Sequence, residues 1–545
     1  MRIKAPSKGF FIFLLFLTTF QFGYGLDTLR TKKLVLAAKV WGITIFKTEQ
    51  HIAQPDKELL NLIKSADKEE SFEVYRAQIR RWFQKKSSLT KGSCSCYGDG
   101  ALPLPLQWVT DTLLLGRIFS EELDILAHSC SSKESPQYHM KFSIPEFYRG
   151  LKISPNRVDK ASMLLGAIKY WNITNYFYAY LSNCRCDWTN ELPGIINGFD
   201  TLQSYTDYYM AMLQLSQKLH DGHARIFSTW AADQLFGYEL PCEVEVFENM
   251  AIITRTDSSS LLSKNDVITA INHQSIPTGI AYWEKYLSSS TRGWFLHIVR
   301  NYLFSSSDST LNVDIIRNGT PLNLDIPMVK MREKRVIESN DVYNLSSDSI
   351  GYIHLGNLQL YHIPELKKRL QPAKVLIIDA REYPNGTFLG LSPWLIDGEK
   401  LFARHNTCDK KCLCARKRDS SMTLSNEPDR YQGTILFVTD HSTISQGEFM
   451  TLAFMQSTNV ITMGRPTAGA LGVTSQFEIP GGITCKITTS EVTLPNGSKV
   501  QGQGINPHVK ISENEEGTTS DDLIRLAYEY ARRIANANTN KTWNK

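Results

Sequence analysis

Short apolar runs alternate with helical patterns through the last third of the chain. The runs Ile350–Leu355, Val375–Asp379 and Thr434–Val438 have the length and the β-branched content of buried strands. The segment Ile363–Leu370 repeats its apolar residues at helical spacing, as does the segment that begins at Gln446. This alternation predicts an α/β layer, in which ligands bind at the carboxyl ends of the strands.

The same region contains a further strand and a closing helix. Val460–Met463 is a short apolar run typical of a strand. Ser520–Ile534 is predicted to be a helix, because Ser is a preferred N-cap and the two aspartates that follow it suit a first turn. An insertion precedes the strand at Thr434, and we expect its basic residues Arg416–Arg418 to lie in a solvated loop.

Helical patterns dominate the first part of the chain. The last of these helices is expected to end near Gly222, since glycine readily stops a helix. The pattern therefore predicts a largely helical N-terminal domain. The predicted helices are Leu34–Phe46, Leu59–Lys86, Ala161–Leu181 and Thr201–Leu219.

Near Phe236 the pattern changes from helical to alternating. Two strands flank Arg317–Thr320, whose Asn-Gly pair is a hairpin-turn signal. This alternation predicts a small β-rich domain. Its expected strands are Glu243–Arg255, Asp266–Ile271, Asn312–Ile316 and Leu322–Ile326.

The stretch TILFVTDHSTISQGEFMTLAFMQ places Ser445 where a predicted strand meets a predicted helix. A hydroxyl there faces the unpaired N–H groups and the positive end of the helix dipole. This position suits a nucleophile whose reaction intermediate carries an oxyanion. The alternative is that Ser445 only caps the helix, because Ser is a common N-cap.

The composition is that of an ordinary globular protein of 545 residues, with 42% hydrophobic and 21% charged residues. The formal net charge of +5 is not concentrated in a long basic block, so nucleic acid is not a favoured partner. No segment has the ligand spacing of a zinc finger or the His-Glu-x-x-His pattern of metallopeptidases, so we expect no metal and no cofactor.

The first 25 residues have the parts of a signal peptide. Arg2, Lys4 and Lys8 precede the apolar stretch Phe10–Phe20, and small residues precede a cut before Leu26. The alternative is a membrane anchor, but the apolar stretch is shorter than the roughly 20 residues that a span needs. We expect an exported chain, periplasmic or secreted, with no stable membrane insertion after cleavage.

Ten cysteines in an exported chain allow disulfides. Several lie as close pairs, which we interpret as staples of loops. The clustered cysteines are Cys94 and Cys96, Cys184 and Cys186, and Cys408, Cys412 and Cys414.

Six motifs occur in the order found in the C-terminal-processing (tail-specific) serine proteases. The chain most resembles their secreted, histidine-using branch, which is related to the tricorn protease core, and the resemblance runs from about Lys33 to Ser512. The motifs are Leu219–Ala224, Ile350–Ile353, Leu376–Arg381, Thr443–Phe449, Gly464–Gly469 and Gln501–Pro507.

The resemblance implies a multidomain α/β protein. After the signal peptide (1–25) it implies an N-terminal helical domain (26–235) that carries the catalytic histidine, and a PDZ-like β-rich domain (236–330). An α/β, crotonase-like serine protease core (331–545) follows. Residues 262–272 resemble a PDZ segment, and peptide binding is then expected at Gly237, Tyr238 and Leu240.

The resemblance also implies catalytic roles. Ser445 is the nucleophile, and His223 is its base, because Ala470 stands where tail-specific members carry a lysine. Gln501 is expected to orient the imidazole. Glu448 is expected to support the site, or otherwise to be a helix carboxylate without a catalytic role.

The expected oxyanion donors are the N–H of Gln446 and one N–H from the loop at Asn385 and Gly386. The predicted function is an exported serine peptidase that hydrolyses protein or peptide substrates through an acyl-enzyme. The alternative is a catalytically silent relative that binds peptide tails, because the loop before Gly386 lacks a glycine that many relatives have and Gln501 is uncharged. An esterase of the α/β-hydrolase type is disfavoured, since no Gly-x-Ser-x-Gly motif surrounds Ser445.

Overall fold

A computed structural model describes the chain from residue 28 to residue 542 with eight gaps. The predicted signal peptide and the cysteines at 94, 96, 130, 412 and 414 lie outside the described residues. The described residues are 28–87, 106–129, 135–141, 144–184, 186–256, 260–331, 342–408, 416–512 and 518–542. They form two compact units: one contains the residues up to Gln234 with 405–419 and 472–491, and the other contains 235–404, 420–471 and 492–545.

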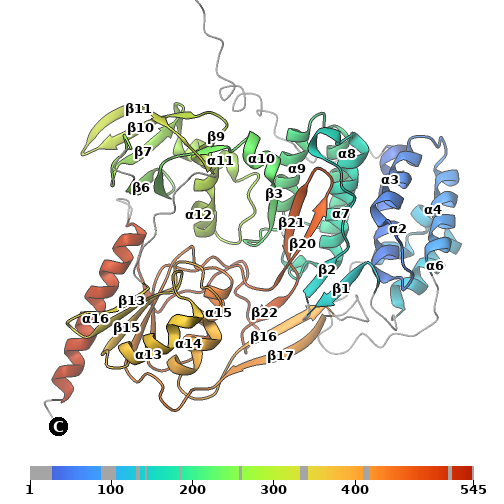
Figure 1. Ribbon diagram of the computed structural model, residues 1–545. Helices are drawn as coiled ribbons and strands as arrows, with labels where there is room; N and C mark the ends of the chain where they lie inside the picture. The colour runs from blue at the N-terminus through green and yellow to red at the C-terminus, as the bar shows by residue number, and fades with distance from the viewer. Residues whose placement is uncertain are drawn as a thin grey trace, which may run out of the picture. The chain divides into compact units, whose positions relative to one another are not determined.

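The first unit is mainly helical (Figure 1). The predicted helix over 59–86 is wrong in its extent, because two helices occupy this segment and Ser71 caps the second of them. Four further helices, α5, α6, α8 and α10, were not predicted. The helices are α2 (Leu29–Lys47), α3 (Pro55–Ala66), α4 (Phe72–Lys86), α5 (Thr112–Leu115), α6 (Arg117–His128), α7 (Lys160–Phe177), α8 (Trp188–Asp200), α9 (Tyr205–Gln217) and α10 (Thr229–Gln234).

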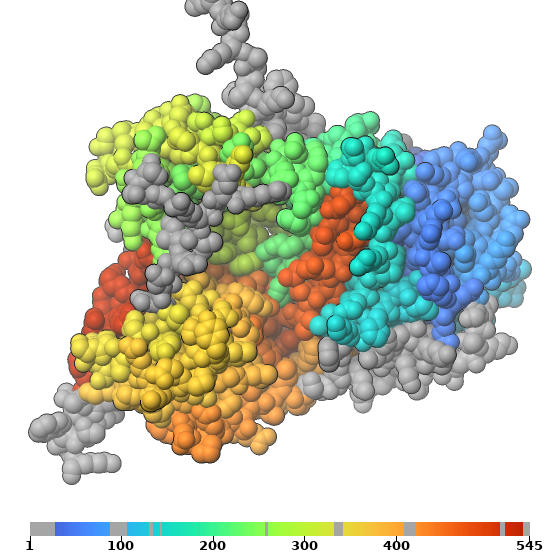
Figure 2. All heavy atoms as spheres, viewed as in Figure 1, coloured from blue at the N-terminus to red at the C-terminus, as the bar shows by residue number. Residues whose placement is uncertain are grey.

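A small antiparallel sheet of this unit joins distant parts of the chain. Strands β20 (Thr474–Ile479) and β21 (Ile483–Thr488) form a hairpin, and β21 pairs with β3 (Arg225–Ser228). In Figure 2 the atoms of this hairpin, in orange-red, lie directly beside atoms of the helical part of the unit, in cyan. A second hairpin consists of β1 (Tyr138–Lys141) and β2 (Ile144–Phe147).

The second unit begins with a β-rich part whose hairpin is confirmed. Asn318 and Gly319 have φ values of 48° and 78° in the turn between β10 and β11, as a two-residue turn of this kind requires. The sheet order is β11-β10-β7-β6-β5. Its strands are β5 (Cys242–Val246), β6 (Ala251–Thr256), β7 (Val267–Ile271), β10 (Thr310–Arg317) and β11 (Thr320–Pro327), with β8 (Gln274–Ser275) beside β7.

Three short strands and two helices complete this β-rich part. The helices were not predicted, because the strand signals around them dominate the sequence. They are α11 (Ile276–Trp283) and α12 (Arg292–Leu303), and the strands are β4 (Tyr238–Glu239), β9 (Ser305–Ser306) and β12 (Val329–Lys330), in the order β12-β4-β9.

The α/β layer predicted for the rest of the unit is confirmed. Its sheet has the order β13-β14-β15-β18-β19-β23, and the strands from β14 to β23 are parallel. The strands are β13 (Tyr343–Leu345), β14 (Ile350–His354), β15 (Val375–Asp379), β18 (Thr434–Thr439), β19 (Val460–Gly464) and β23 (Val509–Lys510).

Helices cover both faces of this sheet (Figure 1). Side chains alternate along β15: Leu376 and Ile378 face one core, and Val375 and Ile377 face the other. The first core includes α13 (Ile363–Leu370), α14 (Phe388–Leu395) and α15 (Gln446–Phe454), and the second includes α16 (Ser520–Thr542). A strand with both faces covered has no polar face, which is why β15 reads as a continuous apolar run.

The expected solvated loop at Arg416–Arg418 is wrong, because these residues begin a strand. The three-stranded sheet that contains it has the order β17-β16-β22. Its strands are β16 (Lys400–Cys408), β17 (Arg416–Leu424) and β22 (Glu491–Thr493).

Candidate active site

Ser445 lies at the junction of β18 and α15, as predicted, in a backbone conformation that non-glycine residues rarely adopt. It is the N-cap of α15 with φ 56° and ψ −111°. A residue held in a sparsely populated region costs about 1–3 kcal/mol and persists only when its surroundings fix it. The Ser445 N–H donates to two acceptors, the Ala470 carbonyl at 3.1 Å and Glu448 Oε2 at 3.1 Å.

Glu448 is fully buried beneath this turn and accepts four hydrogen bonds. Its Oε1 accepts from the Thr467 hydroxyl at 2.6 Å and from the Gly469 N–H at 2.7 Å. Its Oε2 accepts from the Ala470 N–H at 2.9 Å as well as from Ser445. Burial raises the pKa of Glu448 to about 7, although these four donors each favour the ionised form. Glu448 is thus a buried carboxylate that ties the serine to the segment 467–470.

The nucleophile turn, residues 440–447, is braced from the other side by the end of β15. The Thr443 hydroxyl donates to the Ala380 carbonyl at 3.0 Å and accepts from the Asp440 N–H at 3.1 Å. Burial acts to raise the pKa of Asp440, but the Arg381 guanidinium, the hydrogen bonds from Ser442 and the charge of His297 together outweigh burial, and the pKa is lowered. Arg381 also holds the buried Asp379 with bonds of 2.8 and 2.7 Å. The turn therefore rests on a charged network at the carboxyl edge of the sheet.

The predicted oxyanion donors differ in whether they already donate a hydrogen bond within the protein. Within the described residues the Gln446 N–H, at the start of α15, donates no hydrogen bond. The Gly386 N–H donates to the Pro384 carbonyl at 3.0 Å, and the Asn385 side chain donates to the Leu358 carbonyl at 3.2 Å. A Cβ built on Gly447 would lie 4.0 Å from Pro384 Cδ, so this loop is next to the first turn of α15.

Gln501 lies beside the segment 467–470 rather than free to turn. Its Oε1 accepts from the Leu471 N–H at 3.0 Å, and the N–H of the next residue, Gly502, donates to the Gly469 carbonyl at 2.8 Å. In the second unit the structure therefore brings together Ser445, Gln446, Glu448, Gln501 and the loop that contains Gly386.

The predicted peptide-binding residues have their backbone groups engaged. Tyr238 pairs with Lys330 on one side and with Ser306 on the other. The Gly237 carbonyl accepts from Met331, and the Leu240 N–H donates to Phe304 at 3.2 Å. A peptide that added to β4 would have to displace β9 or β12.

His223 belongs to the first unit, in the histidine turn, residues 220–224. The helix before it ends at Gln217, and the left-handed residue is His220, with φ 47°, rather than the expected Gly222. The His223 N–H donates to Asp221 Oδ1 at 3.0 Å. Its ring Nδ1 lies 3.2 Å from the Thr488 hydroxyl, which donates to Asp221 Oδ2 at 2.6 Å.

The charge on His223 is controlled mainly by burial. Burial lowers the pKa of His223 to about 4; Asp221 acts to raise it, and Lys486 and Arg225 act to lower it. The imidazole is therefore neutral at neutral pH and available as a base. The sequence pointed to His223 through the motif Leu219–Ala224, but it contained no signal for Thr488, which lies 265 residues away.

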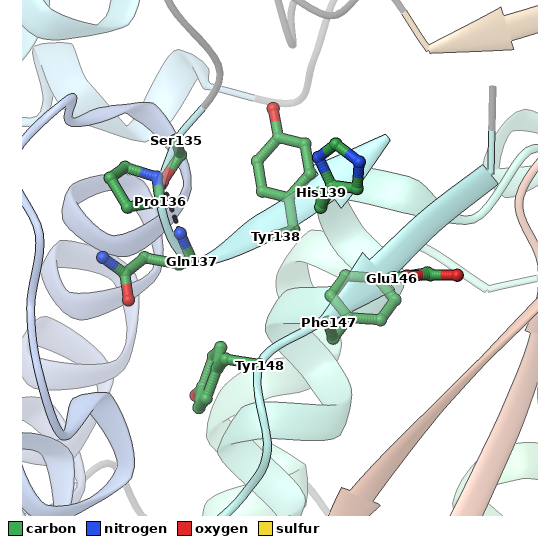
Figure 3. A pocket seen from close by; sticks show the side chains of 8 residues that line it. All are labelled: Ser135, Pro136, Gln137, Tyr138, His139, Glu146, Phe147 and Tyr148. Atoms are coloured by element: carbon green, nitrogen blue, oxygen red, sulfur yellow. Dashed lines mark hydrogen bonds between the residues drawn. The ribbon is translucent and has the colours of Figure 1, made fainter. Parts of the chain in front are cut away.

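A separate surface hollow lies in the first unit and involves none of these residues. Ser135–His139 and Glu146–Tyr148, at the hairpin of β1 and β2, line it (Figure 3). Among the described residues no three His, Cys, Asp or Glu side chains meet to form a metal site. No described helix is both long enough and apolar enough to cross a membrane. Cys184 and Cys186 are free thiols with their sulfurs 2.8 Å apart.

Comparison with known proteins gives one family and several similar folds. Residues 349–511 match the model of peptidase family S41. No curated protein matches the chain in sequence. The structure resembles mature CPAF in complex with lactacystin (13% identity, TM-score 0.55, covering 71% of this chain and 99% of that one). It also resembles mature CPAF alone (12% identity, TM-score 0.53, covering 69% and 96%). The photosystem II D1 C-terminal processing protease matches less well (13% identity, TM-score 0.41, covering 67% and 97%).

Proposed function

Because the chain belongs to peptidase family S41 through residues 349–511, we propose that it is a serine peptidase of protein or peptide substrates with Ser445 as nucleophile. The observation that carries this proposal is the conformation of Ser445. It is held at φ 56° between a parallel strand and a helix N-terminus by a buried carboxylate. Strain that is maintained by surrounding bonds is typical of active sites.

In the proposed reaction the Ser445 hydroxyl attacks a peptide carbonyl, and its proton passes to His223. The amine leaves with a proton returned from His223, and water then hydrolyses the acyl-enzyme. The intermediate's oxyanion is bound by the Gln446 N–H, and this role is supported by its lack of a hydrogen-bond acceptor among the residues that the structure describes. A second donor, the Gly386 N–H, would exchange its bond to Pro384 for the oxyanion. Each such donor is typically worth about 3–4 kcal/mol in the transition state.

Two observations support His223 as the base. The position of the family's lysine is occupied by Ala470, which is buried and cannot take a proton. Burial also lowers the pKa of His223 to about 4, so its imidazole is neutral at neutral pH and able to accept a proton.

Hydrolysis of casein by the mature chain tests this function. Ser445→Ala and His223→Ala are expected to lose nearly all activity while keeping the circular dichroism spectrum of the wild type. Ser498→Ala and His139→Ala change an exposed serine and an exposed histidine and serve as matched controls that keep activity. Full activity in His223→Ala would show that another group is the base.

The second candidate is a silent relative that binds peptide tails through the β-rich part, which we propose to be PDZ-like. This candidate is favoured by the hydrogen bond from the Gly386 N–H to the Pro384 carbonyl, because one of the two predicted oxyanion donors is then already used. A serine-reactive phosphonate separates the candidates. Labelling at Ser445 supports the peptidase, whereas an inert wild type without labelling supports the binding protein.

We also propose that residues 1–25 are removed during export to the periplasm or the exterior. Sequencing of the N-terminus of the exported protein tests this proposal. A mature chain that begins at Leu26 is expected, and an intact N-terminus retained in a membrane fraction would contradict it.

A further inference from the structure

Three buried side chains of the first unit form a chain of hydrogen bonds that ends on the ring of His223. Asp221 Oδ2 lies 2.6 Å from the Thr488 hydroxyl, and the same hydroxyl lies 3.2 Å from His223 Nδ1. All three residues are at most 5% exposed. The contacts therefore occur where water does not compete for them.

The number of protons determines the direction of these bonds. An ionised carboxylate only accepts, and the 2.6 Å distance is that of a charge-assisted O–H···O⁻ bond. The single proton of Thr488 is then used by Asp221, so its oxygen can only accept from the imidazole. His223 must carry its proton on Nδ1, which leaves the lone pair of Nε2 free.

We propose that Asp221 and Thr488 are the positioning residues of His223 and that they select, through this hydroxyl relay, the tautomer that can act as a base at Nε2. The inference rests on the proposed function, in which His223 takes the proton of Ser445. It assigns the orienting role to Asp221 and Thr488 instead of to Gln501, whose Oε1 is already bound to the Leu471 N–H.

The backbone around the relay holds its members in place. Thr488 ends β21, which pairs with β3 directly after the histidine turn, and its carbonyl accepts from the Ala179 N–H at 2.8 Å. The other carboxylate oxygen of Asp221 accepts the His223 N–H, so one carboxylate fixes both the ring and the turn. Three charged groups act on the imidazole: Asp221 from the same turn, Arg225 from β3 and Lys486 from β21.

The relay also has a role when the ring becomes charged. Once His223 accepts a proton at Nε2, the imidazolium still donates from Nδ1 to Thr488, and Asp221 stabilises its charge through the hydroxyl. No proton moves along the relay. The proton that binds Nε2 comes from the Ser445 hydroxyl, whose O–H bond breaks as the serine oxygen attacks the substrate carbonyl. A neutral glutamine could hydrogen-bond the ring but could not supply this charge.

The test measures the tautomer directly in the full-length mature chain. Protein labelled with ¹⁵N-histidine gives ring nitrogen shifts, and His223→Gln identifies the signal of His223. The wild type is expected to show Nδ1–H. In Asp221→Asn the new NH₂ donates to Thr488, whose proton then turns toward Nδ1, so the tautomer is expected to reverse to Nε2–H. Reversal is expected to lower kcat on the order of 10³- to 10⁴-fold with little change in KM.

Thr488→Val removes the hydroxyl at nearly constant volume. It is expected to give a mixture of tautomers and to lower kcat about 10- to 100-fold. Thr488→Ser restores the hydroxyl and is expected to recover both properties. Thr489→Val is the matched control, because the neighbouring hydroxyl bonds to Ser475 instead of the histidine turn.

An unchanged Nδ1–H tautomer in folded Asp221→Asn and Thr488→Val would overturn the relay. If Thr488→Val does not fold, Asp221→Asn and Thr488→Ser decide the question. A wild type that shows the expected tautomer and its reversal but hydrolyses no substrate would contradict the proposed function and leave the relay supported.

Discussion

The nucleophile turn and the histidine turn each contain one buried carboxylate that accepts hydrogen bonds from several groups. The two carboxylates differ in how far along the sequence their hydrogen-bond donors lie. Glu448 binds residues no more than 22 positions away, through Ser445 and the segment 467–470. Asp221 binds Thr488, 267 positions away. Local partners leave a sequence motif, whereas distant partners depend on the pairing of β21 with β3. A functional group can therefore be visible in the sequence while the residue that orients it is not.

The largest effect is expected from removing the carboxylate of the nucleophile turn. Glu448→Leu leaves three buried donors, on Thr467, Gly469 and Ala470, without an acceptor. An unsatisfied buried donor costs about 1–3 kcal/mol, so the free energy of unfolding should fall by about 4 kcal/mol. Urea denaturation measures this fall, and casein hydrolysis should disappear with it.

Glu365→Leu is the matched control for this substitution. Glu365 also lies in the first turn of a helix, α13, but it is exposed. Its loss should cost only the few tenths of a kcal/mol of a carboxylate near a helix N-terminus. Equal losses in the two variants would show that Glu448 is an ordinary helix carboxylate.

Much of the core that carries Ser445 was predictable from the sequence. The strands β14, β15 and β18 and the helix α15 follow from apolar runs and from helical spacing, which are local signals. The Asn-Gly hairpin of the β-rich part is local for the same reason. These elements were confirmed because their faces are covered in the way that their patterns require.

The parts that escaped prediction depend on contacts between distant segments. The hairpin of β20 and β21 completes a sheet with β3, and nothing in either segment indicates the other. The helices α11 and α12 are short and lie among strand signals. The sequence around Thr488 indicates only a strand, because the proposed role of its hydroxyl depends on contacts with Asp221 and His223, which are distant in the sequence.

The second prediction concerns pH, because the two turns respond to it in opposite directions. The pKa of Glu448 is raised from 4.5 to about 7, so between these values the folded chain holds a proton that the unfolded chain has lost. Stability from Glu448 therefore falls as pH rises from 4.5 to 7. The pKa of His223 is lowered from 6.5 to about 4, so its contribution rises as pH rises from 4 to 6.5.

Each of these differences is worth about 3 kcal/mol, and in the wild type they nearly cancel. His223→Gln should expose the falling contribution of Glu448, and Glu448→Gln should expose the rising contribution of His223. Melting temperatures between pH 4 and pH 8, taken as differences from the wild type, measure both slopes. Two variants with parallel curves would contradict the contrast between the turns.

The smallest effect is expected from substitutions at two glycines, one just before β20 and one in the turn between β20 and β21. A Cβ on Gly472, with φ 138°, would lie 2.3 Å from the Ser490 carbonyl and 2.7 Å from Thr488 Cγ2. A Cβ on Gly482, with φ 65°, meets no atom within 4 Å. Gly482→Ala should therefore cost only the left-handed backbone strain of about 1 kcal/mol, and Gly472→Ala about 2–3 kcal/mol.

The two glycine variants also differ in what they do to His223. Gly472→Ala must push Thr488 aside, which lengthens its bond to Asp221 and should shift the ring nitrogen signals of His223. Gly482→Ala leaves Thr488 in place and should leave those signals unchanged. If both variants moved the signals equally, any disturbance of the hairpin would suffice, and the hydroxyl itself would not be what holds the ring. If only Gly472→Ala moves them, the position of one side chain, 265 residues from the histidine, sets the state of the base.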